Sequence, residues 1–296
     1  MASSAAKKKL VVAGGTGFLG SRICKSAVAR GWDVTSISRS GEPQWSSITS
    51  SPEPPPWSTS VTWAKGDMLK PASYTPHLKS ATAVVHTMGI LLEADYKGVL
   101  TGKESPVSGL QRAFSTYKAG AASNPLDRKP GEELGKGEKD GQLTYELMNR
   151  DSAIALAREA QEVGGVECFV YISAAAGTFM LPKRYITTKR EAEDAIATNF
   201  VKMRNVFIRP GFLYDSSRKF TLPIMAAGAV GNTFNEMLGG RLTSVFGAAV
   251  EKPLKADLVA EAVVEGIVSG EAKGVVDTAG IEPWRRRRGG GRCCRL

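Results

Sequence analysis

Histidine and cysteine are scarce in this chain, and their scarcity excludes several kinds of site. The 296 residues include two histidines and four cysteines. Two histidines leave almost nothing from which to build a Ser-His-Asp relay or a histidine-rich metal site. The cysteines are too few for a disulfide scaffold of this size, and their spacing does not suit a four-ligand zinc site. We therefore expect no metal centre at the residues concerned, which are His77, His86, Cys24, Cys168, Cys293 and Cys294.

A long hydrophobic run is also missing, since no apolar stretch approaches the roughly 20 residues that span a bilayer. The net charge of +10 is confined to the two ends of the chain. Six arginines and one glutamate in 281–296, with three lysines at 7–9, account for +8 and leave +2 for the body. Because this distribution does not predict a basic groove, we expect no nucleic-acid partner.

Short apolar runs alternate with helical stretches along the chain. Each run ends at a small or polar residue, which is typical of fully buried parallel strands. This order predicts an α/β fold of the Rossmann type, a doubly wound parallel sheet with a small C-terminal substrate or interaction lobe. The expected strands are 10–13, 33–38, 61–64, 83–86, 167–172 and 205–208, and the expected helices are 18–30, 145–163, 185–199 and 256–268.

The same pattern predicts where the domain begins and ends. We expect one nucleotide-binding domain over 9–280, between an N-terminal tail (1–8) and a basic C-terminal tail (281–296). Three segments within the domain do not follow the alternation of apolar strands and helices. A Ser- and Pro-rich surface stretch near 41–60 and a Gly- and Lys-rich insertion near 93–141 are expected to be mobile, and the small lobe is placed near 212–255.

The first strand runs into a glycine-rich turn that opens a helix. Gly14, Gly17 and Gly20 form the pattern G-x-x-G-x-x-G between the two elements. In such a turn, glycines permit the bend, the approach of a pyrophosphate to backbone amides, and close packing of helix on strand. The anion then lies at the positive end of the helix. We predict dinucleotide binding by Gly14, Gly15, Thr16, Gly17, Phe18, Leu19 and Gly20.

The end of the second strand bears on which nucleotide is bound. Ser38, Arg39 and Ser40 stand where an NAD-binding protein would have Asp or Glu, and Asp33 lies at the opposite end of the strand. A guanidinium flanked by hydroxyls suits a 2′-phosphate, so NADP(H) is favoured over NAD(H). The alternative is that Arg39 is a solvated loop residue.

Two further residues follow expected strands, and each has two interpretations. Asp67 comes after the third strand, where it would accept a hydrogen bond from the adenine amino group or only form a turn. Gly89 comes after the fourth strand, where it would let the cofactor approach or merely belong to a loop. The residues alone do not choose between these alternatives.

Ser173, Tyr185 and Lys189 form a candidate acid–base site. Tyr185 and Lys189 are four residues apart, which places both on one face of a helix, and Ser173 ends a strand. An ammonium beside a phenol is expected to lower the tyrosine pKa, and so to make Tyr185 a proton donor or acceptor for a carbonyl or hydroxyl group held by Ser173. An ordinary amphipathic helix is the alternative.

Two polar residues near this site are harder to interpret. Asn149, on the preceding helix, would orient a proton relay, although a polar residue on a solvated helix face is the simpler interpretation. His86 lies within an apolar strand, and we expect a satisfied core residue rather than a catalyst.

Together these motifs resemble the short-chain dehydrogenase/reductase superfamily. The resemblance narrows to an atypical branch related to the complex I accessory subunit, which includes fungal mitochondrial proteins associated with coenzyme Q biosynthesis. Because Tyr185 follows Ser173 by only 12 positions, a nucleotide-sugar epimerase is a poor interpretation. The segments that carry the resemblance are 14–24, 84–93, 124–126, 145–149, 185–193 and 209–212.

The resemblance implies a protein on the matrix side of the mitochondrial inner membrane. It also implies association with the coenzyme Q synthesis complex, and it is compatible with a peripheral contact to the inner membrane. It adds Lys189 and Pro210 to the expected cofactor contacts. The implied activity is NADPH-dependent reduction of a quinone-type or carbonyl substrate. The alternative is a non-catalytic, nucleotide-binding subunit of that assembly or of a respiratory complex.

Overall fold

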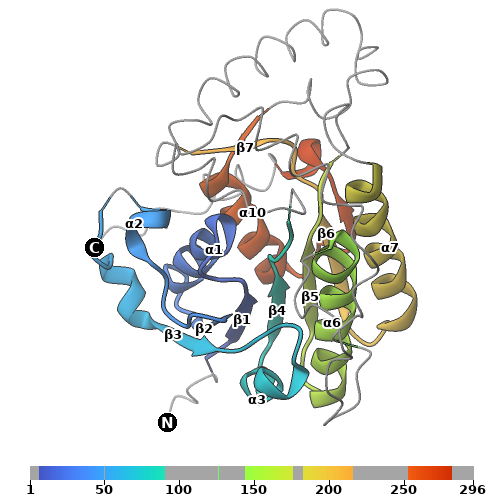
Figure 1. The fold of residues 1–296 in the computed structure, drawn as a ribbon, viewed down its shortest axis with the longest axis horizontal. Helices are drawn as coiled ribbons and strands as arrows, with labels where there is room; N and C mark the ends of the chain where they lie inside the picture. Colours follow the sequence, from blue (N-terminus) through green and yellow to red (C-terminus); the bar gives the residue numbers. More distant parts are fainter. Residues whose placement is uncertain are drawn as a thin grey trace, which may run out of the picture.

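A seven-stranded parallel sheet organises the computed structural model, which describes residues 7–49, 51–90, 126, 144–175, 183–215 and 253–281. The strand order is β3-β2-β1-β4-β5-β6-β9, so the chain winds outward in both directions from β1 and β4 (Figure 1). This order confirms the doubly wound Rossmann-type sheet. The strands are β1 (Lys9–Ala13), β2 (Asp33–Ser38), β3 (Val61–Lys65), β4 (Ala83–His86), β5 (Cys168–Ile172), β6 (Arg204–Ile208) and β9 (Gly274–Val276).

Helices cover both faces of the sheet because its central strands are apolar on both sides. Leu10 and Val12 of β1 face the cluster that contains α1 and α10, whereas Val11 and Ala13 face the cluster of α3, α6 and α7. Figure 1 shows the two helical layers on opposite sides of the strands. The helices are α1 (Phe18–Val28), α3 (Thr75–Leu78), α6 (Ser152–Val163), α7 (Lys183–Asn199) and α10 (Ala256–Ser269).

The predicted strands and long helices are largely confirmed, and the differences concern an unexpected π-helical turn, short elements and boundaries. The expected helix 145–163 begins as a π-helical turn, η5 (Glu146–Asp151), before it continues as α6. Strand β9 was not predicted, because three residues are too short to show a period. Ile281, which was assigned to the C-terminal tail, is fully buried in the core and so belongs to the domain.

The stretch 41–60, expected as a surface excursion, is partly built into the protein. It contains α2 (Trp45–Ile48) and η1 (Pro56–Ser60). Trp45 is buried, and its ring lies edge-on to those of Trp57 and Trp63, at 5.7 and 5.5 Å between centroids. Apolar packing therefore anchors a segment whose composition suggested only solvent exposure.

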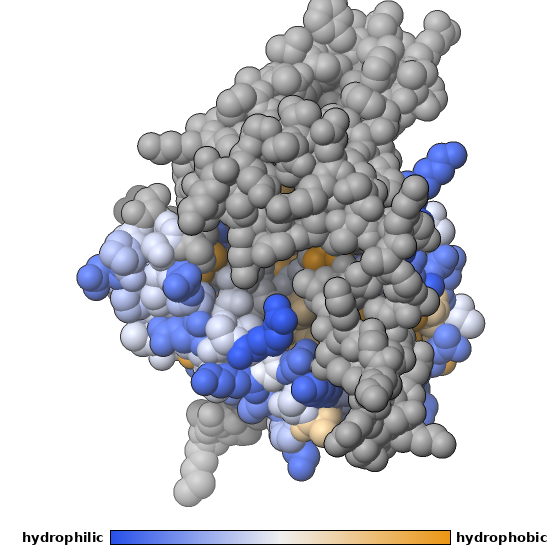
Figure 2. All heavy atoms as spheres, in the orientation of Figure 1, coloured by the Kyte–Doolittle hydropathy of each residue, from blue (hydrophilic) through white to orange (hydrophobic). Residues whose placement is uncertain are grey.

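The other segments singled out in the sequence lie largely outside the described residues. They are the insertion at 93–141, most of the lobe at 212–255 and the tail beyond residue 281. At the edges of the lobe, β7 (Leu213–Tyr214) pairs in parallel with β8 (Leu254–Lys255). Within the described ranges no helix has both the length and the apolar character needed to cross a membrane. Where Figure 2 shows the described surface, hydrophilic residues predominate.

Candidate functional site

The glycine-rich turn lies at the carboxyl end of β1 and is held by close backbone packing. Gly14 adopts a φ of +83°, which favours glycine, and a Cβ there would come within 2.7 Å of Thr87 Oγ1. A Cβ on Gly20 would lie 2.9 Å from Gly14 C and from Gly15 Cα. The turn therefore packs helix against strand as the sequence motif predicted.

The N-terminus of α1 has the features of an anion site. Gly17 is the N-cap residue, no side chain caps the first turn, and that turn has no acidic residue. The first amides of a helix need partners from outside it, and they favour negative charge. Gly17 is exposed, Thr16 and Phe18 are half-buried, and Leu19 is buried. The turn thus fits a dinucleotide pyrophosphate.

Three residues expected at the cofactor's 2′-phosphate stand together at the carboxyl end of β2. Ser38 Oγ is 3.3 Å from Ser40 Oγ and donates to Gly41 O at 2.9 Å, while Arg39 is exposed. Lys65, at the end of β3, pairs in register with Ser38 and is also exposed. Sequence analysis missed this second cation, although its place at the end of the neighbouring strand was a usable signal.

Asp67 has the local contacts of a turn residue. Its Oδ1 accepts a hydrogen bond from Leu69 N at 3.1 Å, and its backbone N–H donates to Ser73 Oγ at 2.9 Å. These contacts account for the aspartate as part of a turn. A role toward adenine remains a prediction.

The segment that follows β4, residues 87–90, is called the exit of β4; it lies between the glycine-rich turn and the candidate acid–base site. At one end, Thr87 Oγ1 donates to Ala13 O at 2.8 Å, directly before the turn. At the other end, a Cβ on Gly89 would lie 3.5 Å from Lys189 Nζ and 2.9 Å from Asn149 Oδ1. Strands β1, β4, β5 and β6 are parallel neighbours, so their carboxyl ends meet at one sheet edge.

Asn149 is fully buried, so the interpretation as a residue on a solvated helix face is wrong. Its Oδ1 accepts from Ile90 N at 2.9 Å, and its Nδ2 donates to Ile90 O at 3.4 Å. Its own carbonyl, within the π-helical turn, accepts a hydrogen bond from Tyr171 OH. Helical periodicity could not show this, because a π-turn changes which residues face inward.

His86 is a buried core residue, as expected, but it is not fully satisfied, because its Nδ1 has no hydrogen-bond partner among the described residues. Its Nε2 lies 3.1 Å from Ser152 Oγ, and its ring stacks at a tilt on Tyr171, with 5.5 Å between centroids. Burial lowers the pKa of His86 to about 3, so the imidazole is neutral at physiological pH. The neutral imidazole therefore lies in the core between Ser152 of α6 and Tyr171 of β5.

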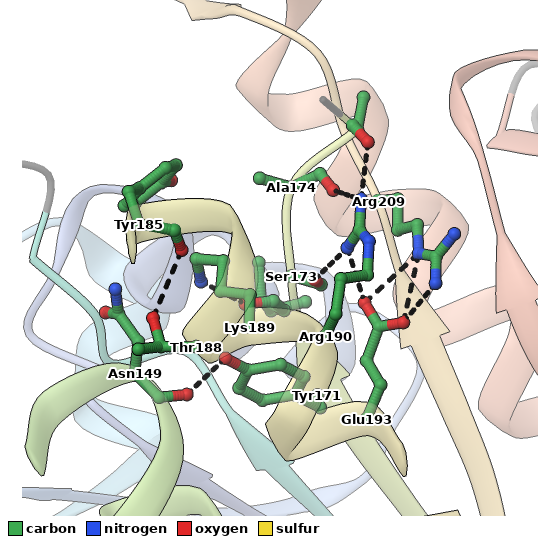
Figure 3. A network of polar contacts seen from close by, with 12 residues as sticks. Asn149, Tyr171, Ser173, Ala174, Tyr185, Thr188, Lys189, Arg190, Glu193 and Arg209 are labelled. Carbon is green, nitrogen blue, oxygen red and sulfur yellow. Dashed lines mark hydrogen bonds and ion pairs between the residues drawn. The ribbon is translucent and has the colours of Figure 1, made fainter. Parts of the chain in front are cut away.

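Ser173 and Lys189 are buried at the carboxyl end of β5, and Tyr185 is half-buried beside them. Lys189 Nζ donates to Ile172 O at 3.1 Å and lies 5.7 Å from the Tyr185 ring centroid (Figure 3). Among the described residues, no hydrogen bond joins Tyr185 OH to Ser173 or Lys189. The structure thus brings the three predicted residues into one region, but the hydrogen bonds that would link Tyr185 OH to the other two are not formed.

The electrostatics of this site differ from the expectation for Tyr185. Burial raises the pKa of Tyr185 to about 12, so the predicted lowering of its pKa was wrong for this state of the protein. Burial also lowers the pKa of Lys189 to about 7, although the Glu193 carboxylate opposes that shift. The physical reason is that desolvation outweighs the attraction between a cation and a phenolate. Tyr185 is therefore a neutral phenol at neutral pH.

Two arginines that sequence analysis left without a role flank Ser173. Arg190 Nη1 donates to Ser173 Oγ at 3.0 Å and to Glu193 Oε1 at 2.8 Å. Arg209 Nε donates to both carboxylate oxygens of Glu193 at 3.1 Å (Figure 3). Pro210 is buried next to this group and accepts from Ala175 N at 2.9 Å. The succession Lys-Arg-Glu-Ala-Glu was the signal available in the sequence.

Comparison with known proteins agrees with this geometry. Residues 10–96 match the NAD dependent epimerase/dehydratase family. MIOREX complex component 2 of Saccharomyces cerevisiae is 34% identical over 283 residues, which cover 90% of this chain and 96% of the yeast protein. An uncharacterized chloroplastic protein of Arabidopsis thaliana is 27% identical and covers 71% of this chain and 52% of its own length.

Solved structures share the fold at low sequence identity. MoeE5 in complex with UDP-glucose and NAD has a TM-score of 0.53 and 15% identity, with 91% of this chain and 75% of that chain covered. Vestitone reductase from alfalfa (Medicago sativa L.) has a TM-score of 0.51 and 17% identity, with 92% and 76% covered. The chain therefore belongs to the NAD(P)-binding, short-chain dehydrogenase/reductase-like family that includes yeast MIOREX complex component 2.

Proposed function

We propose that this protein is an NADPH-dependent reductase of a carbonyl or quinone-type substrate. One observation carries the proposal: the exit of β4 packs against both the glycine-rich turn and Lys189, so a cofactor on α1 would extend toward Ser173 and Tyr185. The cofactor would be held by the 14–20 turn, by Ser38, Arg39 and Ser40, and by Lys189 and Pro210. Lys65 would assist Arg39 at the 2′-phosphate, since both are exposed cations.

In this proposal, bound NADPH supplies a hydride to the substrate carbon, and the protein supplies the proton. Ser173 binds the substrate oxygen through its hydroxyl. Tyr185 gives its phenolic proton to that oxygen, a role that suits a tyrosine protonated at neutral pH. Lys189, with a pKa of about 7, can hold or release a proton at Nζ near the same pH. At neutral pH Tyr185 is thus in the protonated form that reduction needs, whereas oxidation would need its phenolate as a base.

The cellular role is proposed on the family resemblance. We place the protein in mitochondria, on the matrix side of the inner membrane, where it would act in or regulate coenzyme Q biosynthesis and associate with the synthesis complex. The name of the yeast relative, a complex component, supports membership of a multiprotein assembly. Purification of the tagged protein from mitochondria, with identification of the proteins that accompany it, tests this placement.

The activity is tested by measuring NADPH binding and NADPH oxidation separately. Calorimetry gives the affinity for NADPH and NADH, and absorbance follows NADPH oxidation with a short-chain benzoquinone or an aromatic aldehyde as substrate. Tyr185→Phe should lower turnover by at least about a hundredfold and change NADPH affinity little, since general acids contribute that much. Full turnover by Tyr185→Phe would remove Tyr185 from the acid–base role.

Tyr74→Phe is the matched control for this substitution. Tyr74 is fully buried in the core, and among the described residues its hydroxyl has no hydrogen-bond partner. Removal of an unpartnered hydroxyl should leave folding, binding and turnover unchanged.

A non-catalytic subunit is the second candidate function, and the complex named for the yeast relative favours it. In that role, Tyr185 and Lys189 would only hold the cofactor's ribose. Tight NADPH binding without oxidation of NADPH by either substrate class would support the subunit over the enzyme. Failure to bind either nucleotide would overturn both candidates.

A further inference from the structure

Arg190 contacts Ser173 through a guanidinium whose two terminal nitrogens each donate two hydrogen bonds. Its Nη1 donates to Ser173 Oγ at 3.0 Å and to Glu193 Oε1 at 2.8 Å. Its Nη2 donates to Ala174 O at 2.8 Å and to Ala175 O at 2.5 Å. Figure 3 shows the guanidinium between Ser173, Ala174 and Glu193. Because all four Nη hydrogens are engaged, Arg190 is placed to orient Ser173 rather than to bind substrate itself.

A hydrogen bond from arginine determines the direction of the serine hydroxyl. Arginine is only a donor, so Ser173 Oγ must accept from Arg190, and its own proton points elsewhere. Within the described part of the chain, that proton has no acceptor. The hydroxyl therefore presents a donor at the carboxyl end of β5, and the neighbouring cation polarises it.

The charges behind Ser173 do not cancel. Glu193 is only 3% exposed and is shared between Arg190 and Arg209, which gives two cations for one carboxylate. Among the residues that the structure describes, the other ionisable groups that face this corner are Lys189 and Tyr185 of α7 and Tyr171 of β5. Because none of these adds a second carboxylate, the excess charge at Ser173 is positive.

We propose that Arg190 is a positioning residue that directs the Ser173 proton away from the guanidinium, toward the substrate, and places uncompensated positive charge behind it, so that the site binds its substrate oxygen as an oxyanion. This inference rests on the proposed reductase site and narrows its substrate class. The substrate is a ketone, aldehyde or quinone whose oxygen gains negative charge as the hydride arrives, or a compound that already carries a phenolate or enolate. Donors aimed at a developing oxyanion stabilise it strongly.

A phenolate probe tests the inference without turnover. The full-length protein is saturated with NADPH and titrated with 4-nitrophenol, whose phenolate absorbs visible light and whose phenol does not. Wild type should bind the phenolate in preference to the phenol. Arg190→Gln should reduce the bound phenolate-to-phenol ratio by about tenfold, equivalent to one unit of the probe's pKa. Ser173→Ala should reduce it to a similar extent.

The double variant and two controls separate orientation from mere structural support. Because Arg190 acts in part through the Ser173 hydroxyl, Arg190→Gln combined with Ser173→Ala should reduce the ratio by less than the product of the two single losses. Arg190→Lys keeps the positive charge but not the paired donors of the guanidinium, and it should reduce the phenolate-to-phenol ratio by about threefold. It replaces Arg190→Gln if that variant does not fold. Arg30→Gln breaks a remote Arg30–Glu265 ion pair and should leave the probe unaffected.

The possible results distinguish this inference from the proposed function. An unchanged ratio in Arg190→Gln, with lowered thermal stability, would assign Arg190 a purely structural role and overturn the inference. Absence of phenolate binding by the NADPH-loaded wild type would also overturn it. In both cases the proposed reductase would still hold if the protein binds and oxidises NADPH. Failure to bind NADPH would instead overturn the proposed function itself.

Discussion

A methyl group on Gly20 tests whether the glycine-rich turn is both a packing device and a cofactor site. In Gly20→Ala, the new Cβ would lie 2.9 Å from Gly14 C and Gly15 Cα. All three nearest atoms belong to backbone, so no flexible side chain can move aside. Helix α1 must then shift away from the turn, and the amides at its N-terminus move with it.

The magnitude follows from two opposing effects. Overpacking of this kind costs about 1–3 kcal/mol, and the better helix propensity of alanine returns up to about 1 kcal/mol. We expect a net loss of about 1–2 kcal/mol, which lowers Tm by about 2–8 °C for a domain of this size. NADPH at one hundred times the wild-type Kd stabilises the wild type by about 2.7 kcal/mol; a tenfold weaker affinity reduces that gain to about 1.4 kcal/mol.

Thermal melts with and without NADPH, together with calorimetry, measure both effects. Gly17→Ala is the graded comparison, because its Cβ would meet only Gly14 O, at 3.0 Å. It should keep most of the stability and still weaken NADPH binding, since Gly17 is exposed at the helix N-terminus. Gly280→Ala, after β9, is the control for binding: its Cβ would lie 3.2 Å from Val276 Cγ1, so it can alter stability but should leave the NADPH affinity unchanged. Wild-type stability and wild-type affinity in Gly20→Ala would refute the reasoning.

The remaining predictions concern cofactor choice and the buried lysine. Arg39→Gln should weaken NADPH binding by about tenfold and leave NADH binding unchanged, with a smaller effect for Lys65→Gln, by calorimetry; equal losses for both nucleotides would contradict a 2′-phosphate contact. Lys189 has a pKa of about 7 in the folded protein against an ordinary 10.5, so the unfolded chain holds the extra proton between these values. The unfolding free energy should therefore rise from pH 7 to 9 by about 2 kcal/mol more in wild type than in Lys189→Met, measured by urea denaturation; parallel profiles would show that Lys189 does not titrate in this range.

Local patterns were enough to predict the sheet and the glycine-rich turn. A buried parallel strand must be apolar on both faces, and the bend into α1 has room only for glycine at Gly14 and Gly20. These constraints act over a few neighbouring residues, so they leave a pattern that can be recognised in the amino-acid sequence. The six longer strands and the turn follow from them, whereas β9 is too short to carry such a pattern.

The polar part of the candidate site depended on contacts between distant segments. Asn149 is buried because a π-helical turn rotates it toward Ile90, and no helical period reveals such a turn. Arg190 meets Ser173 only because α7 packs against the end of β5.

The pKa of Tyr185 likewise depends on how much solvent its neighbours exclude, and this reversed the shift that the Tyr-x-x-x-Lys spacing suggested. Amino-acid order alone therefore determined the architecture and the turn suited to a nucleotide. The tertiary structure decided which polar side chains are buried, how they are oriented and which are charged, because desolvation and long-range hydrogen bonds exist only once the chain is folded.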